Sequence, residues 1–266
     1  MNTQPANIAK IVIPLVIATT LGGIGPSLAV ADIINISPCR DNTLYEYVPA
    51  DGDRSNAFGN HFFAGETAMG ELRRGVLAFD VSGSIPAGST ITSVTLSVNM
   101  SMTPSDTPRI VELHKLLAEW GQGTSQASGG EGQGAPATSN DPTWRHRFFD
   151  TIFWTTQGGD FSGTVSGSQS VGGVGVYTWS SPQMVADVQS WLDNPDSNFG
   201  WLVLGDESEI ATAKRFDTRE SASLPLLTIE YTPTIKASTS PMVSICEQVR
   251  PTPRPRPTPL PRPTPR

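Results

Sequence analysis

Five basic residues stand just ahead of two apolar, strand-like segments, and their chemistry suits the binding of carboxylates. They are Arg73, Arg74, Lys214, Arg215 and Arg219. The first two precede residues 75–81 and the other three precede residues 224–231. A guanidinium group presents a planar fork of donors that matches a carboxylate. If the two segments lie close together, the sequence predicts one basic patch that could hold an acidic ligand such as a uronate polymer.

Acidic neighbours of these cations support a structural interpretation of the same segments. Arg219 and Glu220 could pair with Asp80 and with Arg73 or Arg74. Such pairs would fix strand register, because a slip of one residue turns every side chain to the other face of a sheet. We favour this interpretation over ligand binding, since partly buried ion pairs commonly specify geometry.

Tryptophan side chains could complete a sugar-binding site, because a flat aromatic face covers the apolar side of a sugar ring. Trp120, Trp144 and Trp154 lie beside loop-rich segments and are the predicted ligand contacts. Trp191 and Trp201 occupy positions typical of a core.

Recognisable catalytic motifs are absent from the sequence: it has no HExxH, G-x-S-x-G or P-loop pattern. His61, His114 and His146 are scattered. His146 is the best candidate for acid–base chemistry, because Asp141 and Asp150 are near it in sequence, but a hydrogen-bonded structural histidine is the favoured interpretation. We therefore expect no catalytic residue.

Oxygen-bearing side chains near the start of the mature chain are the candidates for calcium ligation. They are Asp41, Glu46, Asp51 and Asp53. Alternating aspartates suit a loop that folds around a hard cation. An ordinary polar turn is the preferred interpretation, so we expect no cofactor, with structural calcium as the alternative.

The elements that position these residues are short strands separated by Gly, Ser, Pro and Asn clusters. Alternating apolar residues predict strands at 43–48, 75–81, 91–100, 109–116, 174–179, 201–205 and 226–231. Residues 182–193 instead have helical spacing, with Ser181 as a cap and Pro182 at the first helical position. The Gly/Ser-rich stretch 121–140 is predicted to be a long loop. The pattern indicates an all-β, jelly-roll-like antiparallel sandwich with one packed helix.

The two ends of the chain predict export and a separate tail. Residues 1–31 combine Lys10, an apolar run and Ala29-Val30-Ala31, the pattern of a secretory signal. No later segment is long and apolar enough to cross a membrane. Residues 250–266 place proline at every odd position from 251 to 265, which predicts an extended cationic arm, either a spacer or a tether. The domain expected between them covers residues 32–249.

Charge is divided unevenly between these parts. One of the 18 Lys and Arg residues lies in the signal and five lie in the tail, which leaves 12 against 25 acids in residues 32–249, a formal charge of -13. A body this acidic lacks the basic footprint that nucleic acid requires.

The two cysteines, Cys39 and Cys246, flank the patterned region. In an exported protein they are expected to form a disulfide, with two unpaired thiols as the alternative. Such a bridge would close nearly the whole domain into one loop, worth up to about 5 kcal/mol.

Several segments, taken in order, resemble the DNRLRE-domain family of exported bacterial β-sandwiches. They are DNTLYE (41–46), RRGVLAFDVSGSIPAGSTITSVTLSV (73–98), MVADVQSWLDNPDSNFGWLVLG (184–205) and RFDTRE (215–220) followed by LPLLTIEY. Members of this family often accompany polysaccharide-degrading modules, and some resemble carbohydrate-binding modules. The resemblance covers most of residues 39–232 and implies a jelly-roll-like fold and glycan binding. We expect this chain to depart from that arrangement, without an attached catalytic module.

These observations predict a secreted or surface-displayed, non-catalytic module that binds extracellular or cell-envelope polysaccharide. Two alternatives stay open: a structural or adhesive matrix protein, and a polysaccharide lyase or hydrolase. The sequence leaves the oligomeric state undetermined.

Overall fold

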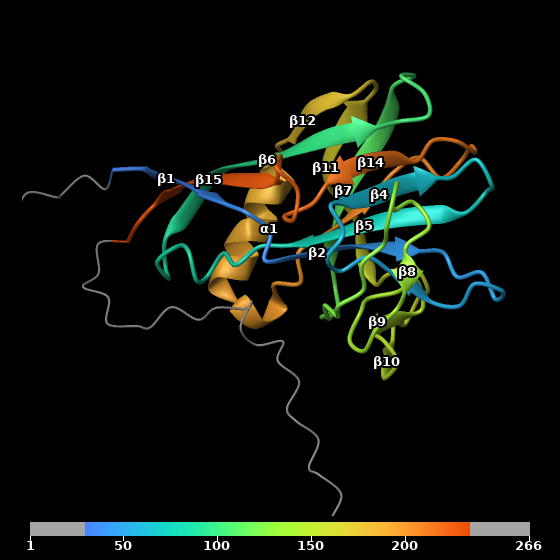
Figure 1. The fold of residues 1–266 in the computed structure, drawn as a ribbon. Helices are drawn as coiled ribbons and strands as arrows, with labels where there is room; N and C mark the ends of the chain where they lie inside the picture. Colours follow the sequence, from blue (N-terminus) through green and yellow to red (C-terminus); the bar gives the residue numbers. More distant parts are fainter. Residues whose placement is uncertain (1–29, 235–266) are drawn as a thin grey trace, which may run out of the picture.

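The computed structural model describes residues 30–234, so residues 1–29 of the predicted signal, the tail at 250–266 and Cys246 lie outside the described residues. Figure 1 shows the fold, which is mostly antiparallel β-sheet with one α-helix. The strands are β1 (Asp32–Ile36), β2 (Arg40–Tyr45), β3 (Arg54–Ser55), β4 (His61–Glu66), β5 (Leu72–Ala78), β6 (Thr90–Met102), β7 (Arg109–Leu116), β8 (Ala135–Pro136), β9 (His146–Phe148), β10 (Ile152–Phe153), β11 (Phe161–Val171), β12 (Gly175–Trp179), β13 (Trp201–Leu204), β14 (Lys214–Asp217) and β15 (Leu226–Thr232). The helices are α1 (Pro182–Asp193) and the 3-10 turn η1 (Pro195–Ser197).

The main strands follow one curled path that folds into two facing sheets. The first sheet contains β1, β15, β6, β12, β14 and β4, and the second contains β2, β5, β13, β7 and β11. Strand β4 joins the two, because Ala64 pairs with Lys214 of β14 and Gly65 pairs with Arg73 of β5. All of these pairings are antiparallel. The predicted all-β sandwich with one packed helix is therefore confirmed.

The main core fills the space between the two sheets. Alternate residues of β6, among them Val94, Leu96 and Val98, face inward and are buried, while the residues between them face outward. Trp191 of α1 and Trp201 of β13 pack together with ring centroids 4.6 Å apart, as core residues.

Helix α1 packs against β6 and β11, and its bounds match the predicted 182–193. Ser181 accepts a hydrogen bond from the Met184 amide, as a capping residue does. Asp187 is buried on the inner face of the helix and accepts hydrogen bonds from Ser166 Oγ and Trp201 Nε1 at 2.5 and 3.0 Å. The helix is therefore held to β11 and β13 by polar contacts as well as by its apolar stripe.

A second, smaller core lies on the outer face of the second sheet. Segment 117–160, which carries β8, β9 and β10, covers this face with buried side chains. The core residues are Leu44, Val76, Ala78, Leu116, Trp120, Trp144, Trp154 and Leu202. Strand β5 is consequently buried on both faces, with Leu77 in the main core and Val76 in the second.

Two buried carboxylates hold the Gly/Ser-rich stretch 121–140 in place. Asp141 accepts hydrogen bonds from the amides of Gly123 and Thr138 at 2.9 and 2.7 Å. Glu131 accepts them from the Asn56 side chain and the His61 amide at 3.0 and 2.9 Å. The stretch is therefore an anchored part of segment 117–160, which we call the cover.

Candidate functional site

The three tryptophans predicted to contact a ligand are buried in the second core. The side chains of Trp120, Trp144 and Trp154 are covered, and the indole nitrogens of Trp120 and Trp154 donate to the carbonyls of Phe199 and Thr143. This corrects the prediction that they offer flat faces to a sugar. Their flanking loops fold back over the sheet instead of projecting from it.

The predicted basic patch does not form, because most of its members are used in separate places. Arg73 pairs with Glu71 at 2.6 Å, and Arg74 makes two hydrogen bonds to Glu207 at 2.7 and 2.8 Å. Arg74 also lies over the rings of Trp144 and Phe161, at 4.8 and 5.4 Å from their centroids. These two guanidinium groups hold the structure together.

The remaining basic residues lie on β14 and just after it. Lys214 is buried, and its Nζ donates to Thr103 Oγ1 and to the carbonyls of Ser105 and Gly172. Burial lowers the pKa of Lys214. Arg215 is half-buried and lines the same small cavity as Arg73.

The predicted ion pairs of segment 215–220 also differ from the structure. Arg219 and Glu220 pair with each other at 2.7 Å, and Arg219 also donates to the carbonyl of Cys39. Asp80 accepts a hydrogen bond from the Gly83 amide at 3.0 Å, in the turn after β5. The segment does hold register, but through backbone pairing of β14 with β4 and β6. No cysteine is free in residues 30–234, and the expected partner of Cys39 falls outside that range.

Asp41 is buried close to Arg219 and to the half-buried Glu220. Asp41 accepts the Arg219 amide at 2.9 Å through one oxygen, while its other oxygen and Glu220 Oε2 have no hydrogen-bond partner within residues 30–234. Burial, followed by the charge of Glu220, raises the pKa of Asp41 to about 7.

The four calcium candidates are engaged separately and do not converge. Besides Asp41, Glu46 accepts the Leu72 amide at 2.8 Å, and Asp53 pairs with Arg145. The carbonyl of Asp51 accepts from Arg54 within its turn. Residues 30–234 contain no group of three or more His, Cys, Asp or Glu side chains that could hold a metal ion. The four side chains considered as alternative calcium ligands therefore do not come together at one place in the described part of the chain.

His146 is buried beneath the β9–β10 hairpin. Its Nδ1 lies 3.4 Å from Asp53, and its ring stacks on Phe153 with centroids 4.2 Å apart. Asp53, which is remote in sequence, thus occupies the place predicted for Asp141 or Asp150. Burial acts to raise the pKa of Asp53, but the hydrogen bonds that it accepts from Arg145 and Thr143 outweigh burial and lower this pKa. These contacts account for His146 as a structural residue.

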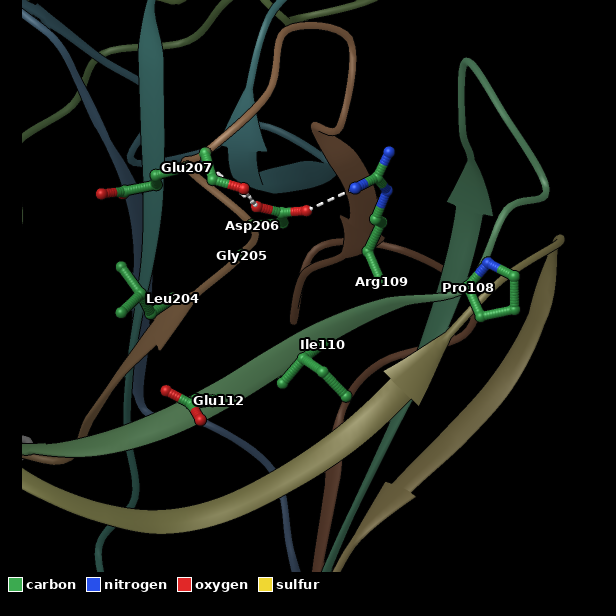
Figure 2. Close-up of a pocket in the computed structure, with 9 residues that line it drawn as sticks. Pro108, Arg109, Ile110, Glu112, Leu204, Gly205, Asp206 and Glu207 are labelled. Carbon is green, nitrogen blue, oxygen red and sulfur yellow. Dashed lines mark hydrogen bonds and ion pairs between the residues drawn. The ribbon is translucent and has the colours of Figure 1, made fainter.

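An open groove of about 740 Å³ lies on the part of the second sheet that the cover leaves exposed. Figure 2 shows its floor on β7 and β13 and its wall in the loop after β13. Glu112 and Leu204 are register partners on the outer face. Ile110 lies two residues before Glu112 on β7 and therefore shares this face. The lining residues are Pro108, Arg109, Ile110, Glu112, Leu204, Gly205, Asp206, Glu207 and Ser208.

Most charged groups of the groove are fixed by partners. Arg109 pairs with Asp206 at 2.9 Å and with Glu209 at 2.5 Å, and these contacts, Glu209 first, raise its pKa. Hydrogen bonds from Ser208 and the contact with Arg109 lower the pKa of Asp206. The groove thus presents ordered carboxylates and a guanidinium group to solvent.

Glu112 is held from below by His114, whose Nε2 lies 3.2 Å from Glu112 Oε2. His114 Nδ1 lies 2.9 Å from the carbonyl of Ser162, which can only accept, so Nδ1 carries a hydrogen. His114 thus links Glu112 of β7 to β11 at the floor of the groove.

Sequence reasoning missed this groove, although one signal was present. Residues 205–209, GDESE, follow a buried strand directly and concentrate three acids. Their partner Arg109 begins a strand on a distant part of the chain, and only the pairing of β13 with β7 brings them together.

Comparison of the chain with models of known protein families gives no match, and comparison with curated proteins gives none either. Within residues 30–234, no helix has the length and apolar character needed to cross a membrane.

Proposed function

We propose that the protein is an exported, non-catalytic module that binds a neutral polysaccharide in the groove of Figure 2. The observation that carries this proposal is the combination of ordered carboxylates and a guanidinium group with exposed apolar side chains in one open groove. Planar charged groups make strong, directional hydrogen bonds, which suits pairs of sugar hydroxyls. Ile110, which is 50% exposed, and Leu204 offer apolar surface to the C–H groups of a sugar ring.

The charge of the groove favours a neutral ligand over the uronate polymer. Four carboxylates, those of Glu112, Asp206, Glu207 and Glu209, stand in or beside it against the guanidinium groups of Arg74 and Arg109. An acidic polymer would meet like charges that oppose its approach. The open form of the groove also suits a chain that continues beyond it at both ends.

The predicted signal at residues 1–31, the predicted cationic tail and the resemblance to the DNRLRE-domain family support a role in the cell envelope or outside the cell. The absence of a recognisable catalytic motif supports a binding function. A purified preparation should release no reducing or unsaturated ends from any polysaccharide that it binds.

Affinity electrophoresis through gels containing neutral or acidic polysaccharides tests this proposal. We expect at least one neutral polymer to retard the protein, and we expect Glu112→Ala to weaken that binding by about tenfold, because a hydrogen bond to a charged group contributes about 1.5–3 kcal/mol. Glu230→Ala is the matched control, because Glu230 lies on β15 of the first sheet. It should bind as the parent does.

A shortened protein that lacks residues 250–266 separates the groove from the tail. Retardation that survives this deletion and falls in Glu112→Ala supports the groove. Retardation lost with the tail, equal retardation of Glu112→Ala and Glu230→Ala, or binding of acidic polymers alone would each contradict the proposal. Assembly at high protein concentration without binding to any polysaccharide would favour the adhesive alternative.

A further inference from the structure

A second cavity, of about 260 Å³, lies where β4 passes from the first sheet to the second. Its walls come from β4, from the end of β6 and from the loop that precedes β14. The lining residues are Phe63, Glu66, Thr67, Ala68, Arg73, Met102, Thr103, Pro104, Gly132, Gln133, Ala211, Ala213 and Arg215. We call this cavity the Arg215 pocket.

The walls of the Arg215 pocket are mainly apolar. Phe63 is nearly covered, Met102 is 43% exposed at the rim, and small side chains at Ala211 and Ala213 leave the space open. Its volume is below the ~300 Å³ at which pockets for drug-sized ligands begin. Transfer of a small apolar group from water to such walls is favourable. The space therefore suits the apolar body of a small molecule.

Two cations without carboxylate partners stand beside these walls. In the described part of the chain, neither Lys214 nor Arg215 lies within ion-pair distance of an acid, although the protein as a whole is acidic. Lys214 is saturated by three oxygens, one of which belongs to the pocket residue Thr103. Its charge adds to the positive potential without blocking the cavity.

Arg215 is positioned but not saturated. Its Nε donates to Ser101 Oγ at 3.1 Å, which orients the guanidinium group. Within residues 30–234, its two terminal nitrogens make no hydrogen bond. Arg73, by contrast, is occupied by Glu71 at 2.6 Å and by the carbonyls of Gly132 and Leu72. Arg215 is thus the group with donors to spare for a ligand.

One acid, Glu66, also lines the Arg215 pocket and opposes an anionic ligand. Its Oε1 would lie 3.6 Å from a Cβ placed on Gly70, so its carboxylate is directed to the β4–β5 turn. Glu71 is neutralised by its pair with Arg73. Glu66 weakens the positive potential of the pocket but does not occupy the Arg215 donors.

We propose that the Arg215 pocket binds a small organic anion with an apolar body and one carboxylate, which Arg215 holds through its terminal nitrogens. A guanidinium fork fits a carboxylate in two parallel hydrogen bonds, while the apolar walls cover the rest of the molecule. This inference does not rest on the proposed glycan-binding function, because the two cavities have different lining residues.

Titration of the ¹⁵N-labelled protein with hexanoate, followed by NMR, tests the proposal. Hexanamide serves as the neutral probe of the same shape. We expect hexanoate to shift the Arg215 side-chain Nε–H signal and the backbone amides of Ala211 and Ala213, and to bind at least tenfold more tightly than hexanamide.

Three variants sharpen the test. Arg215→Gln should weaken hexanoate binding about tenfold and leave hexanamide binding unchanged. Arg147→Gln is the matched control, because Arg147 likewise has no carboxylate partner in the structure but lies at the cover, over Phe148. Glu66→Gln should strengthen hexanoate binding, because it removes the one opposing charge that has no ion-pair partner.

Equal affinity for hexanoate and hexanamide, signal shifts confined to other surfaces, or unchanged hexanoate binding by a folded Arg215→Gln protein would each overturn the proposal. The amide spectrum of each variant reports whether it is folded. Glycan retardation is measured with a different ligand and different variants, so failure of one proposal leaves the other standing.

Discussion

The groove and the Arg215 pocket both take residues from the same two loops, but they differ in whether their charged side chains have partners of opposite charge. The connection between β6 and β7 supplies Pro108 to the groove and Pro104 to the pocket, and the loop between β13 and β14 supplies Asp206 to the one and Ala211 to the other. Nearly every charged side chain of the groove is paired, whereas Arg215 has no acidic partner among residues 30–234. Pairing fixes the shape of a polar surface, while an oriented but unpaired cation keeps its attraction for a ligand.

The largest expected difference between the two cavities is in the free energy of unfolding that is lost when an arginine of each is replaced. Arg74→Ala removes the two hydrogen bonds to Glu207, the bond to the Gly158 carbonyl and the contact with Trp144, and leaves Glu207 without its partner. We expect the free energy of unfolding to fall by about 3 kcal/mol, since breaking one side of a largely buried ion pair is costly. Denaturant unfolding measures this change.

Arg215→Ala is the counterpart for that measurement. It removes one hydrogen bond at a half-exposed site and should cost about 0.5 kcal/mol, as other surface substitutions do. Equal losses of stability in the two variants would show that the charges of the groove and of the pocket serve the fold alike, and the contrast between the cavities would then fail.

The second effect concerns Asp41, a buried acid that makes no ion pair within residues 30–234. Asp41 has a pKa of about 7 in the folded protein, against 3.8 ordinarily, because burial and the charge of Glu220 disfavour its ionised form. Between these two values the folded state holds more protons than the unfolded state, so stability falls as pH rises. Between pH 5 and pH 7 the loss from this one group should be about 2 kcal/mol.

Asp41→Asn isolates that contribution, because an asparagine oxygen can still accept the Arg219 amide. The free energy of unfolding of parent and variant should be measured from pH 4 to pH 8. As pH rises to 7, the variant should become more stable relative to the parent, and above pH 7 the difference should level off. A constant difference across this range would mean that Asp41 does not carry the buried proton.

The sequence predicts those elements whose signals are local. Helix α1 carries its cap, its proline and its apolar spacing within one segment, and its bounds were predicted as observed. Strand β7 was likewise predicted from its own pattern. Strand β11 was missed because FSGTVSGSQSV is rich in Gly and Ser and lies at the edge of its sheet, where few of its side chains need to be apolar.

The candidate sites depended on long-range packing, which no local pattern encodes. Trp144 was predicted to contact a ligand because it lies beside loop-rich segments, yet the cover places its ring over the second sheet beneath Arg74. Arg215 was predicted to precede a strand, whereas it lies within β14, and its lack of an acidic partner in residues 30–234 follows from the pairing of β14 between β4 and β6. Which cations are neutralised is therefore a property of the fold.

The smallest expected effect is the most direct test of the difference in charge. Salt shortens the reach of electrostatic attraction, from about 10 Å at 0.1 M to about 3 Å at 1 M. Hexanoate affinity should therefore fall several-fold as sodium chloride rises through this range, while hexanamide affinity and neutral glycan affinity change little. If glycan binding weakens with salt as hexanoate binding does, the glycan is held by charge, and the paired groups of the groove cannot be what holds it.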